Sequence, residues 1–306
     1  MLRGGNSVKT ADPNSLGDIR PRPNQAQWLR FDFPCRAGDW VQRLQAVRQA
    51  SHGALAGGFA RKWHYLVLPT GKNLVLKWSI LVRRGSREGL IRHLGSVLGD
   101  GSSAPYEPQV KKFGRKSLPA CETIWWISSE AASAVLDPRW TDRETRIALA
   151  VILQRQLVRA LGPGLSLSPT ETVKVFRDRF IRIGVGGDPE RGADRYRAIA
   201  KVARTAFNPE KLRALEHRLR GQLRPMARRF RKEAERLEVV LCRNPLPRTV
   251  RSTPDRPVNE ILAHRFMHLL SLRLLLSFID EALVAEIVLL SLRTAREGRP
   301  ALNRIA

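Results

Sequence analysis

The stretch that decides the fold runs Trp63-His-Tyr-Leu-Val-Leu68, Pro69-Thr-Gly-Lys72, Asn73-Leu-Val-Leu-Lys-Trp-Ser-Ile-Leu-Val82. Its first and last parts are rich in aromatic and aliphatic residues, which pack well on the pleated surface of a sheet. The four residues between them include a proline and a glycine, as short turns do. We therefore predict two strands, Trp63–Leu68 and Asn73–Val82, joined by a tight turn.

Working outward, the segment Trp28-Leu-Arg-Phe-Asp-Phe33 alternates apolar and polar residues and predicts a third, half-buried strand. Helical spacing of apolar residues follows Asp39, and a short helix is expected over about Arg87–Leu98. From Ala120 onward the pattern is mostly helical and ends in one long apolar helix over Ile261–Leu292. The sequence therefore predicts an α+β fold, with antiparallel sheet elements in the N-terminal half and a largely helical C-terminal half.

The predicted domain organisation is simple. Residues 1–26 carry turn-forming and charged residues without periodicity, so we expect a disordered tail there. Residues 27–306 are expected to form a single α+β domain, because no internal repeat divides them.

The chain is strongly basic. It carries 54 Lys and Arg against 28 Asp and Glu, a formal net charge of +26 over 306 residues. This excess predicts a polyanionic partner, and composition alone leaves nucleic acid, an acidic peptide and a solvated surface open. Within the basic helical segment Arg213–Arg236, the spacing predicts that Glu216 pairs with Arg220.

Several classes of protein are excluded by composition. Cys35, Cys121 and Cys242 lie far apart, so neither a zinc site nor a disulfide framework is indicated and a cytoplasmic location is expected. Residues 1–22 lack the apolar core of a signal peptide. Charged residues interrupt Ile261–Leu292, which favours a helix buried in protein over one buried in lipid.

Ordered motifs resemble the thiopeptide-type bacteriocin biosynthesis domain, which is also the C-terminal elimination domain of class I lantibiotic dehydratases. The matching segments are the opening strand Trp28–Phe33, the aromatic strand pair Trp63–Leu68 and Gly71–Lys77, the Y-E motif Pro105-Tyr-Glu-Pro-Gln-Val-Lys-Lys-Phe-Gly114, the motif from Glu122 to Glu130, and the closing helix His268-Leu-Leu-Ser-Leu-Arg-Leu274. The resemblance implies the elimination-domain fold and a peptide-modifying activity.

Two departures from the family pattern bear on the reaction. Elimination domains are expected to hold a glutamyl carboxylate with arginines in the aromatic strand and in the Y-E motif, and this chain has Val67 and Pro108 there. An apolar side chain offers no paired donors to a carboxylate, so glutamate elimination is disfavoured. In this respect the chain resembles the pyridine synthases of thiopeptide biosynthesis.

That resemblance implies a formal [4+2] union of two dehydroalanines in a modified precursor peptide, with loss of water and of the leader peptide. It implies no redox or metal cofactor, an acidic leader peptide as partner, and other enzymes of the same pathway as further partners. A stand-alone glutamate-elimination partner of a split dehydratase is the alternative within enzymes. A basic RNA-binding module is the alternative of another class.

Three candidate catalytic residues come from the strands and the Y-E motif. Glu107 is expected to transfer protons or orient substrate, with a plain surface carboxylate as the alternative. Tyr106 and Tyr65 are candidate donors to an amide oxygen, although aromatic residues in strands are more often core. For substrate binding we select Glu122, with a structural cap or ion pair as the alternative, and Trp125 and Trp126 as an apolar wall, with helix packing as the alternative.

The closing helix supplies the remaining catalytic candidates. His264, His268 and Ser271 fall on one helix face, and His268 occupies the histidine position of the family. The alternative for the two histidines is a satisfied place in the core. Arg273 falls on the opposite face and is expected to pair with Asp280 or another buried acid.

Basic residues near the motifs are expected to dock the leader peptide. This leader-binding set consists of Lys111, Lys112, Arg115, Lys116, Arg61, Lys62, Lys72 and Lys77. An extended leader adding to the edge of the sheet is one expected arrangement. The alternative is that these side chains only solvate an edge strand.

Overall fold

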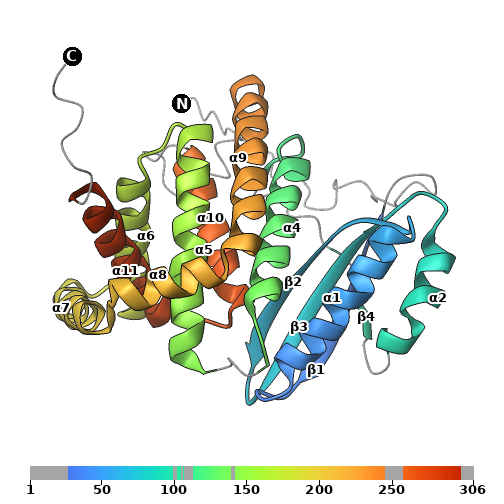
Figure 1. The fold of residues 1–306 in the computed structure, drawn as a ribbon, viewed down its shortest axis with the longest axis horizontal. Coiled ribbons are helices and arrows are strands. Elements are labelled where there is room, and N and C mark those ends of the chain that lie inside the picture. Colours follow the sequence, from blue (N-terminus) through green and yellow to red (C-terminus); the bar gives the residue numbers. More distant parts are fainter. Residues whose placement is uncertain are drawn as a thin grey trace, which may run out of the picture.

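The computed structural model describes residues 27–98, 102–104, 106, 113–138, 142–244 and 258–297. The tail predicted for residues 1–26 lies outside these ranges, as does the prediction for Glu107. A four-stranded antiparallel sheet and a helical C-terminal half confirm the predicted α+β fold (Figure 1).

The sheet has the strand order β2-β3-β1-β4. Its members are β1 (Gln27–Cys35), β2 (Ala60–Thr70), β3 (Asn73–Val82) and β4 (Ser102–Ala104). The predicted hairpin is confirmed, because Thr70 pairs with Asn73 and the tight turn between them is made possible by Gly71, whose φ is +61°. β1 pairs with β3 along its whole length.

The two faces of the sheet differ in character. Phe33, Tyr65 and Trp78 are fully buried on one face. Helix α1 (Trp40–Ala56) lies across this face, and α2 (Arg87–Leu98) packs on α1 (Figure 1). Because side chains of a strand alternate, Trp28 and His64 point to the opposite face, which we call the open face.

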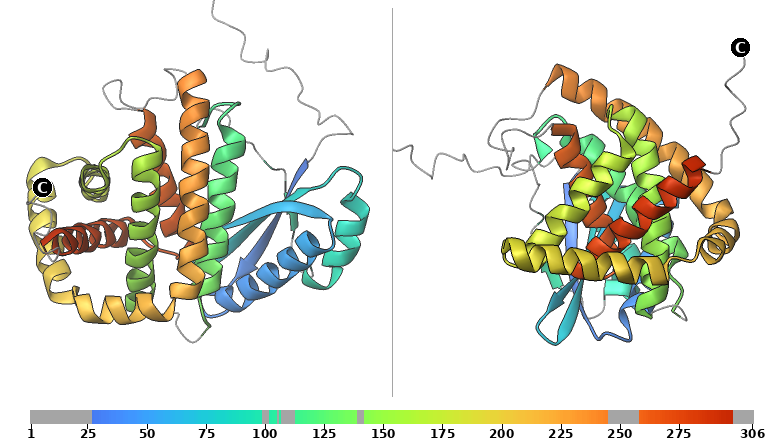
Figure 2. Two further views of the ribbon diagram at one scale, coloured as in Figure 1. Left: turned by 45° about the horizontal axis from the view of Figure 1, so that its top comes forward. Right: turned by 90° about the vertical axis from the view of Figure 1, so that its left-hand side faces the viewer.

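The C-terminal half is a set of packed helices. They are α4 (Leu118–Val135), α5 (Arg143–Gly164), α6 (Pro169–Gly184), α7 (Pro189–Ala206), α8 (Pro209–Arg218), α9 (Arg220–Arg243), α10 (Val258–Arg273) and α11 (Phe278–Glu297). Several of these helices start at an N-cap side chain followed by proline, as at Ser168, Asp188 and Asn208. Helix α4 stands between the sheet and the rest of the helices (Figure 2).

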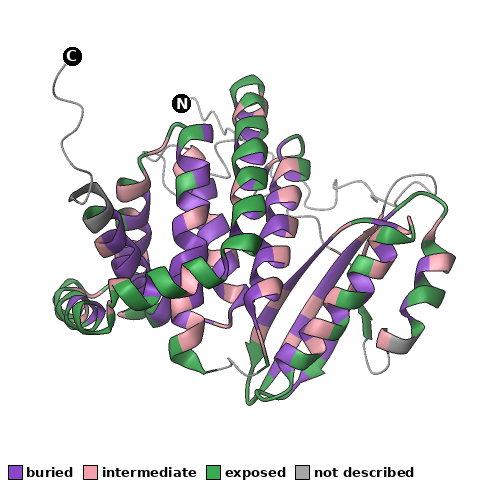
Figure 3. Cartoon of the chain, viewed as in Figure 1, coloured by how far each residue is buried: buried purple, intermediate pink, exposed green. Residues whose placement is uncertain are grey.

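One continuous apolar core joins the two halves. Its buried members run from Phe33 and Trp63 in the sheet to Leu283 and Val288 in α11, and buried residues extend from the strands through α4 and α5 (Figure 3). Among the described helices, none is both long and apolar enough to cross a membrane.

The prediction of one long C-terminal helix is wrong. The chain breaks between α10 and α11, where Leu275 adopts a φ of 53°. Ser277 and Asp280 start the new helix by exchanging bonds, from Ser277 N to Asp280 Oδ2 (3.1 Å) and from Asp280 N to Ser277 Oγ (3.3 Å). This is a capping box, and the reversal it produces folds α11 back so that Glu281 reaches His268 in α10.

Candidate functional site

Aromatic and titratable side chains gather on the open face where β1, β2 and α4 meet. The Trp28 ring stacks on Tyr106 (5.1 Å between centroids) and lies 4.9 Å from His64. The His64 ring lies 5.6 Å from Trp125 of α4. We call Trp28, His64, Tyr106, Glu122 and Trp125 the open-face cluster.

A phenol and a carboxyl group form the polar centre of this cluster. The Tyr106 hydroxyl donates to Glu122 Oε1 at 3.1 Å. Burial raises the pKa of Glu122, while hydrogen bonds from Trp28 and Tyr106 and the charge of Lys62 lower it in part. Burial also raises the pKa of Tyr106. A carboxyl group with a raised pKa holds a proton closer to neutral pH, so Glu122 is suited to general acid–base chemistry.

An imidazole without a hydrogen-bond partner lies next to this pair. His64 is 8% exposed, and its Nε2 has no partner in the described part of the chain. Burial, with the charge of Arg273 as a second cause, lowers the pKa of His64 to about 3, so the ring is neutral at pH 7. Trp125 Nε1 is likewise buried without a described partner. Buried polar atoms are rarely left unpaired, so the cluster retains hydrogen-bonding capacity that the described residues do not use.

Arg273 of α10 lies next to the cluster and holds α4 in place through hydrogen bonds. Its guanidinium donates to Ser129 Oγ (2.9 Å), Leu269 O (2.6 Å) and Trp125 O (3.3 Å), and the Tyr65 hydroxyl donates to Arg273 O (3.2 Å). Burial lowers the pKa of Arg273 to about 10 and raises that of Tyr65. These bonds fasten α10 to α4 and β2.

The predicted pairing of Arg273 with Asp280 is wrong. Asp280 lies past the chain reversal, where its Oδ1 accepts from Arg143 Nε (2.9 Å) and Nη2 (2.5 Å) and its Oδ2 accepts from Ser277. The reversal carries Asp280 away from the helix end at which Arg273 lies, so main-chain carbonyls and a hydroxyl take the place of an acid.

The other face of α10 carries a second titratable pair. His268 Nδ1 lies 2.9 and 3.0 Å from the two carboxylate oxygens of Glu281. Glu281 is 0% exposed and His268 is 33% exposed, and the His268 ring packs beside the rings of Phe180 (5.4 Å) and Phe278 (6.2 Å), which also contact each other. Burial raises the pKa of Glu281 to about 7, with His268 opposing the shift. We call this pair the His268–Glu281 dyad.

The two companions of His268 lie deeper in the helix packing. His264 is buried, with Nε2 3.0 Å from Thr172 O. Ser271 is also buried, where it donates to Met267 O (3.2 Å) and accepts from Gln154 Nε2 (2.9 Å). Of the three candidates on this face, His268 is therefore the one that solvent reaches.

Helix α10 separates the candidates into two regions. Arg273, beside Tyr65 and the open-face cluster, faces β2 and α4, whereas His268 faces α6 and α11. Neither His64 nor Glu281 was predicted from the sequence. Strand alternation beside Tyr65 was a usable signal for His64, while Glu281 becomes a neighbour of His268 only through the chain reversal.

Val67 and the second tryptophan of α4 are the remaining motif positions that the structure describes. Val67 is fully buried. Trp126 Nε1 donates to Glu130 Oε1 (3.1 Å), and the Arg229 guanidinium lies 4.6 Å above the Trp126 ring. Pro108, like Glu107, lies outside the described residues.

The leader-binding set is partly described. Arg61, Lys72, Arg115 and Lys116 are exposed and Lys77 is half-buried, while Lys111 and Lys112 lie outside the described residues. Lys62 is tied down, because its Nζ donates to Thr123 Oγ1 and to Pro119 O (3.2 Å), and burial lowers its pKa.

The edge of β2 is closed to strand addition at its middle. Tyr65 N points outward from the sheet and donates to Ser129 Oγ of α4 at 3.2 Å. A peptide cannot add to the edge of β2 at Tyr65, since α4 already occupies the place of the added strand. Leader addition at an edge of the sheet otherwise stays a prediction.

Comparisons with known proteins agree with this architecture. This chain is similar in structure to part of the tRNA-dependent lantibiotic dehydratase MibB from Microbispora sp. 107891, with 15% sequence identity and a TM-score of 0.55. The match covers 94% of this chain and 29% of MibB. The chain is also similar in structure to TsrL, with 15% sequence identity and a TM-score of 0.52. This match covers 89% of the present chain and 96% of the TsrL chain. No curated protein sequence matches the chain.

The sequence profile of one family extends over nearly all of the described residues. It is the profile of the lantibiotic biosynthesis dehydratase C-terminal domain, which matches residues 22–292. The chain therefore belongs to the family of lantibiotic dehydratase C-terminal domains.

Proposed function

We propose that this chain is a pyridine synthase of thiopeptide assembly. In this reaction one dehydroalanine and its adjoining amide, as the imidic-acid tautomer, act as a 2-azadiene, and a second dehydroalanine of the same peptide is the dienophile. Two new bonds close the six-membered ring. Loss of water and departure of the leader peptide as its carboxamide then leave an aromatic pyridine within a macrocycle.

The observation that carries the proposal is the full burial of Val67, at the position where elimination domains are expected to carry an arginine. Its side chain has no donor for a carboxylate. Arg273, which lies behind this strand, has its guanidinium committed to Ser129 Oγ and to two main-chain carbonyls. Neither Val67 nor Arg273 therefore offers a free guanidinium to a glutamyl carboxylate, which favours ring formation over glutamate elimination.

The open-face cluster has groups for the proton transfers. In our proposal the protonated form of Glu122, which burial favours by raising its pKa, accepts from Tyr106 and donates to the amide oxygen that becomes the imidic-acid hydroxyl. The neutral His64 Nε2 accepts a hydrogen bond from the amide N–H, whose proton is released to solvent. Glu122 regains a proton from solvent after each transfer. It then protonates the hydroxyl that leaves as water and, in the last step, the departing leader amide, while the two ring protons that are lost pass to solvent.

Positioning is the second requirement, because the two dehydroalanines lie in distant parts of one peptide. Holding two reacting groups in place supplies about 7–11 kcal/mol in favourable cases. The half-buried Trp28 offers aromatic surface beside Glu122 and His64, suited to the flat heterocycles of such a peptide.

The direct test incubates the protein with a fully cyclised, dehydrated linear precursor peptide. Mass spectrometry is expected to show a free leader carboxamide, and the product is expected to gain pyridine absorbance. Unchanged peptide, when the protein binds it, would contradict the proposal.

A second substrate separates the two enzyme hypotheses. A glutamylated precursor peptide is expected to remain intact. If glutamic acid is released and dehydroalanine forms, the chain is an elimination domain instead. Charge reversal at the exposed pair Arg115 and Lys116 is expected to weaken leader binding while leaving the turnover rate at saturating peptide unchanged.

A further inference from the structure

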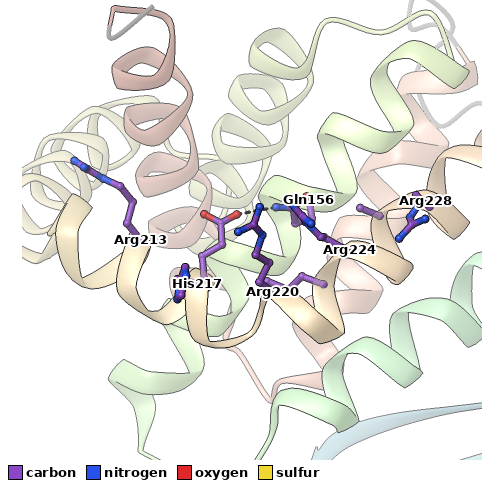
Figure 4. A pocket seen from close by; sticks show the side chains of 9 residues that line it. Gln156, Arg213, His217, Arg220, Arg224 and Arg228 are labelled. Carbon is purple, nitrogen blue, oxygen red and sulfur yellow. Dashed lines mark hydrogen bonds between the residues drawn. The ribbon is translucent and has the colours of Figure 1, made fainter.

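A pocket lies where α8 meets α9. Its residues belong neither to the open-face cluster nor to the His268–Glu281 dyad. It has a volume of about 590 Å³ and is formed by α5, α8 and α9 (Figure 4). Its lining includes Arg213 of α8 and Arg220, Arg224 and Arg228 of α9. Four guanidinium groups around one concavity make this a strongly cationic site.

The arginines of α9 form a regular row. Arg220, Arg224 and Arg228 are spaced at i, i+4 and i+8, so they lie on one side of the helix about 6 Å apart. All three are exposed, as is Arg213. Within the described residues none of these four side chains forms an ion pair, so their charge is available to a ligand.

The carboxylate inside the pocket does not neutralise this row. Glu216 accepts from Arg155 Nη2 and from Gln156 Nε2 (2.7 Å), both on α5. The predicted pairing of Glu216 with Arg220 is therefore wrong, because α5 supplies closer partners than the next helix turn. Glu216 instead fixes α8 against α5 and leaves the arginines of α9 unopposed.

The floor of the pocket limits the kind of anion that fits. Leu223 is buried and Ala227 is half-buried, and both contribute to the lining. None of the lining residues is Phe, Tyr or Trp. Single-stranded nucleic acid is commonly held by aromatic platforms on which bases stack, and the one aromatic ring in this lining is the exposed imidazole of His217. An apolar floor beneath guanidinium groups suits carboxylates that alternate with apolar side chains.

We propose that this pocket binds an acidic peptide segment in which carboxylate and apolar side chains alternate. In an extended segment, every second side chain points the same way, about 6.8 Å apart. This repeat is close to the spacing of the arginine row, so successive carboxylates meet successive guanidinium groups, with apolar side chains directed at Leu223. Binding can be measured without turnover, so this proposal does not rest on the proposed function.

Helix α9 links the pocket to the open-face cluster. Beyond Arg228, the Arg229 guanidinium covers Trp126 of α4, and Glu233 acts electrostatically on Lys62 beside Glu122. From Arg224 to Glu233 the helix rises about 14 Å. A peptide held in the pocket therefore lies within a few residues' reach of this cluster along one helix.

Fluorescence anisotropy with a labelled peptide of alternating Glu and Leu tests the proposal. The full chain is expected to bind this peptide, and a matched peptide of alternating Gln and Leu is expected not to bind. The variant R220E/R224E is expected to weaken binding of the acidic peptide at least about tenfold. The control R204E/R231E makes the same change in net charge at exposed arginines outside the pocket and is expected to retain affinity.

The alternative results overturn the proposal. Equal losses in the pocket and control variants would show that total charge, not the pocket, holds the peptide. Absence of peptide binding to the native chain would also overturn it. Binding of an oligouridylate that R220E/R224E abolishes, without binding of the acidic peptide, would assign the pocket to nucleic acid instead. Circular dichroism of each variant confirms that it is folded.

Discussion

The open-face cluster and the His268–Glu281 dyad lie on opposite sides of α10 and show two ways of tuning proton-carrying groups. In the cluster, burial keeps His64 neutral and raises the pKa of Glu122, and a neutral phenol is the hydrogen-bond partner of that carboxyl group. In the dyad, a fully buried carboxyl group faces a partly exposed imidazole directly. The cluster keeps buried polar atoms without a partner among the described residues, whereas the buried carboxyl group of the dyad is bonded to its own imidazole.

The largest expected effect comes from removing the residue that fastens the two regions together. Arg273→Met is expected to destabilise the protein by about 4 kcal/mol, because Ser129 Oγ, Leu269 O and Trp125 O lose a buried donor. Urea unfolding measures the change. Arg143→Met is the control: it removes a mostly exposed arginine from Asp280 and is expected to cost less than about 1 kcal/mol. Equal effects of the two changes would show that Arg273 is not the fastening residue.

The next largest effect is the pH dependence of stability that the His268–Glu281 dyad produces. Burial raises the pKa of Glu281 from 4.5 to about 7 in the folded chain, so the protonated form stabilises the fold. This contribution is fully present below pH 4.5 and is lost as the pH rises through 7, a change on the order of 3 kcal/mol. Glu281→Gln stays neutral and is expected to remove this decline from the stability–pH curve.

A companion variant checks the sign of that effect. His268 lowers the pKa of Glu281 through its hydrogen bond and charge, so His268→Ala is expected to raise that pKa further. The decline in stability then moves to higher pH. An unchanged curve in both variants would mean that Glu281 does not titrate between these pH values.

A third pair of variants decides which region carries the proposed reaction. Glu122→Gln is expected to slow release of the leader carboxamide by about a hundredfold, since a positioned acid contributes at least that much. His268→Ala is expected to change the rate by no more than a few-fold. The reverse result would move the proposed proton transfers to the dyad side of α10.

The smallest effect concerns the hydroxyl group that contacts Glu122. Tyr106→Phe removes a hydrogen bond that lowers the pKa of Glu122, so this pKa is expected to rise. If protonated Glu122 is the acid, the release rate falls as the pH rises through its pKa, and the variant shifts this fall to higher pH. A shift to lower pH would contradict the proposed role.

Local pattern was enough to predict the hairpin, the strand Trp28–Phe33 and the helical second half, because alternation and helical spacing record burial directly. The break before α11 was missed, although Ser277-x-x-Asp280 is a capping signal. The partners of Arg273, Glu216 and His268 depend on how distant helices pack, and no spacing within one helix records that. The residues of the Y-E motif near Tyr106 were selected from a resemblance, and Tyr106 lies in the cluster as a neighbour of His64.

The contact between Ser129 and the outer edge of β2 also bears on how the protein stays dispersed. An uncovered edge strand is a template for joining the sheet of another molecule. Here α4 covers one edge at Tyr65, and β4 at the other edge has only three residues, Ser102–Ala104. By covering the edge of β2, helix α4 thus hinders sheet-to-sheet association between molecules, in addition to carrying Glu122. Variants that loosen α4 are therefore expected to form oligomers rich in intermolecular sheet before their helices melt.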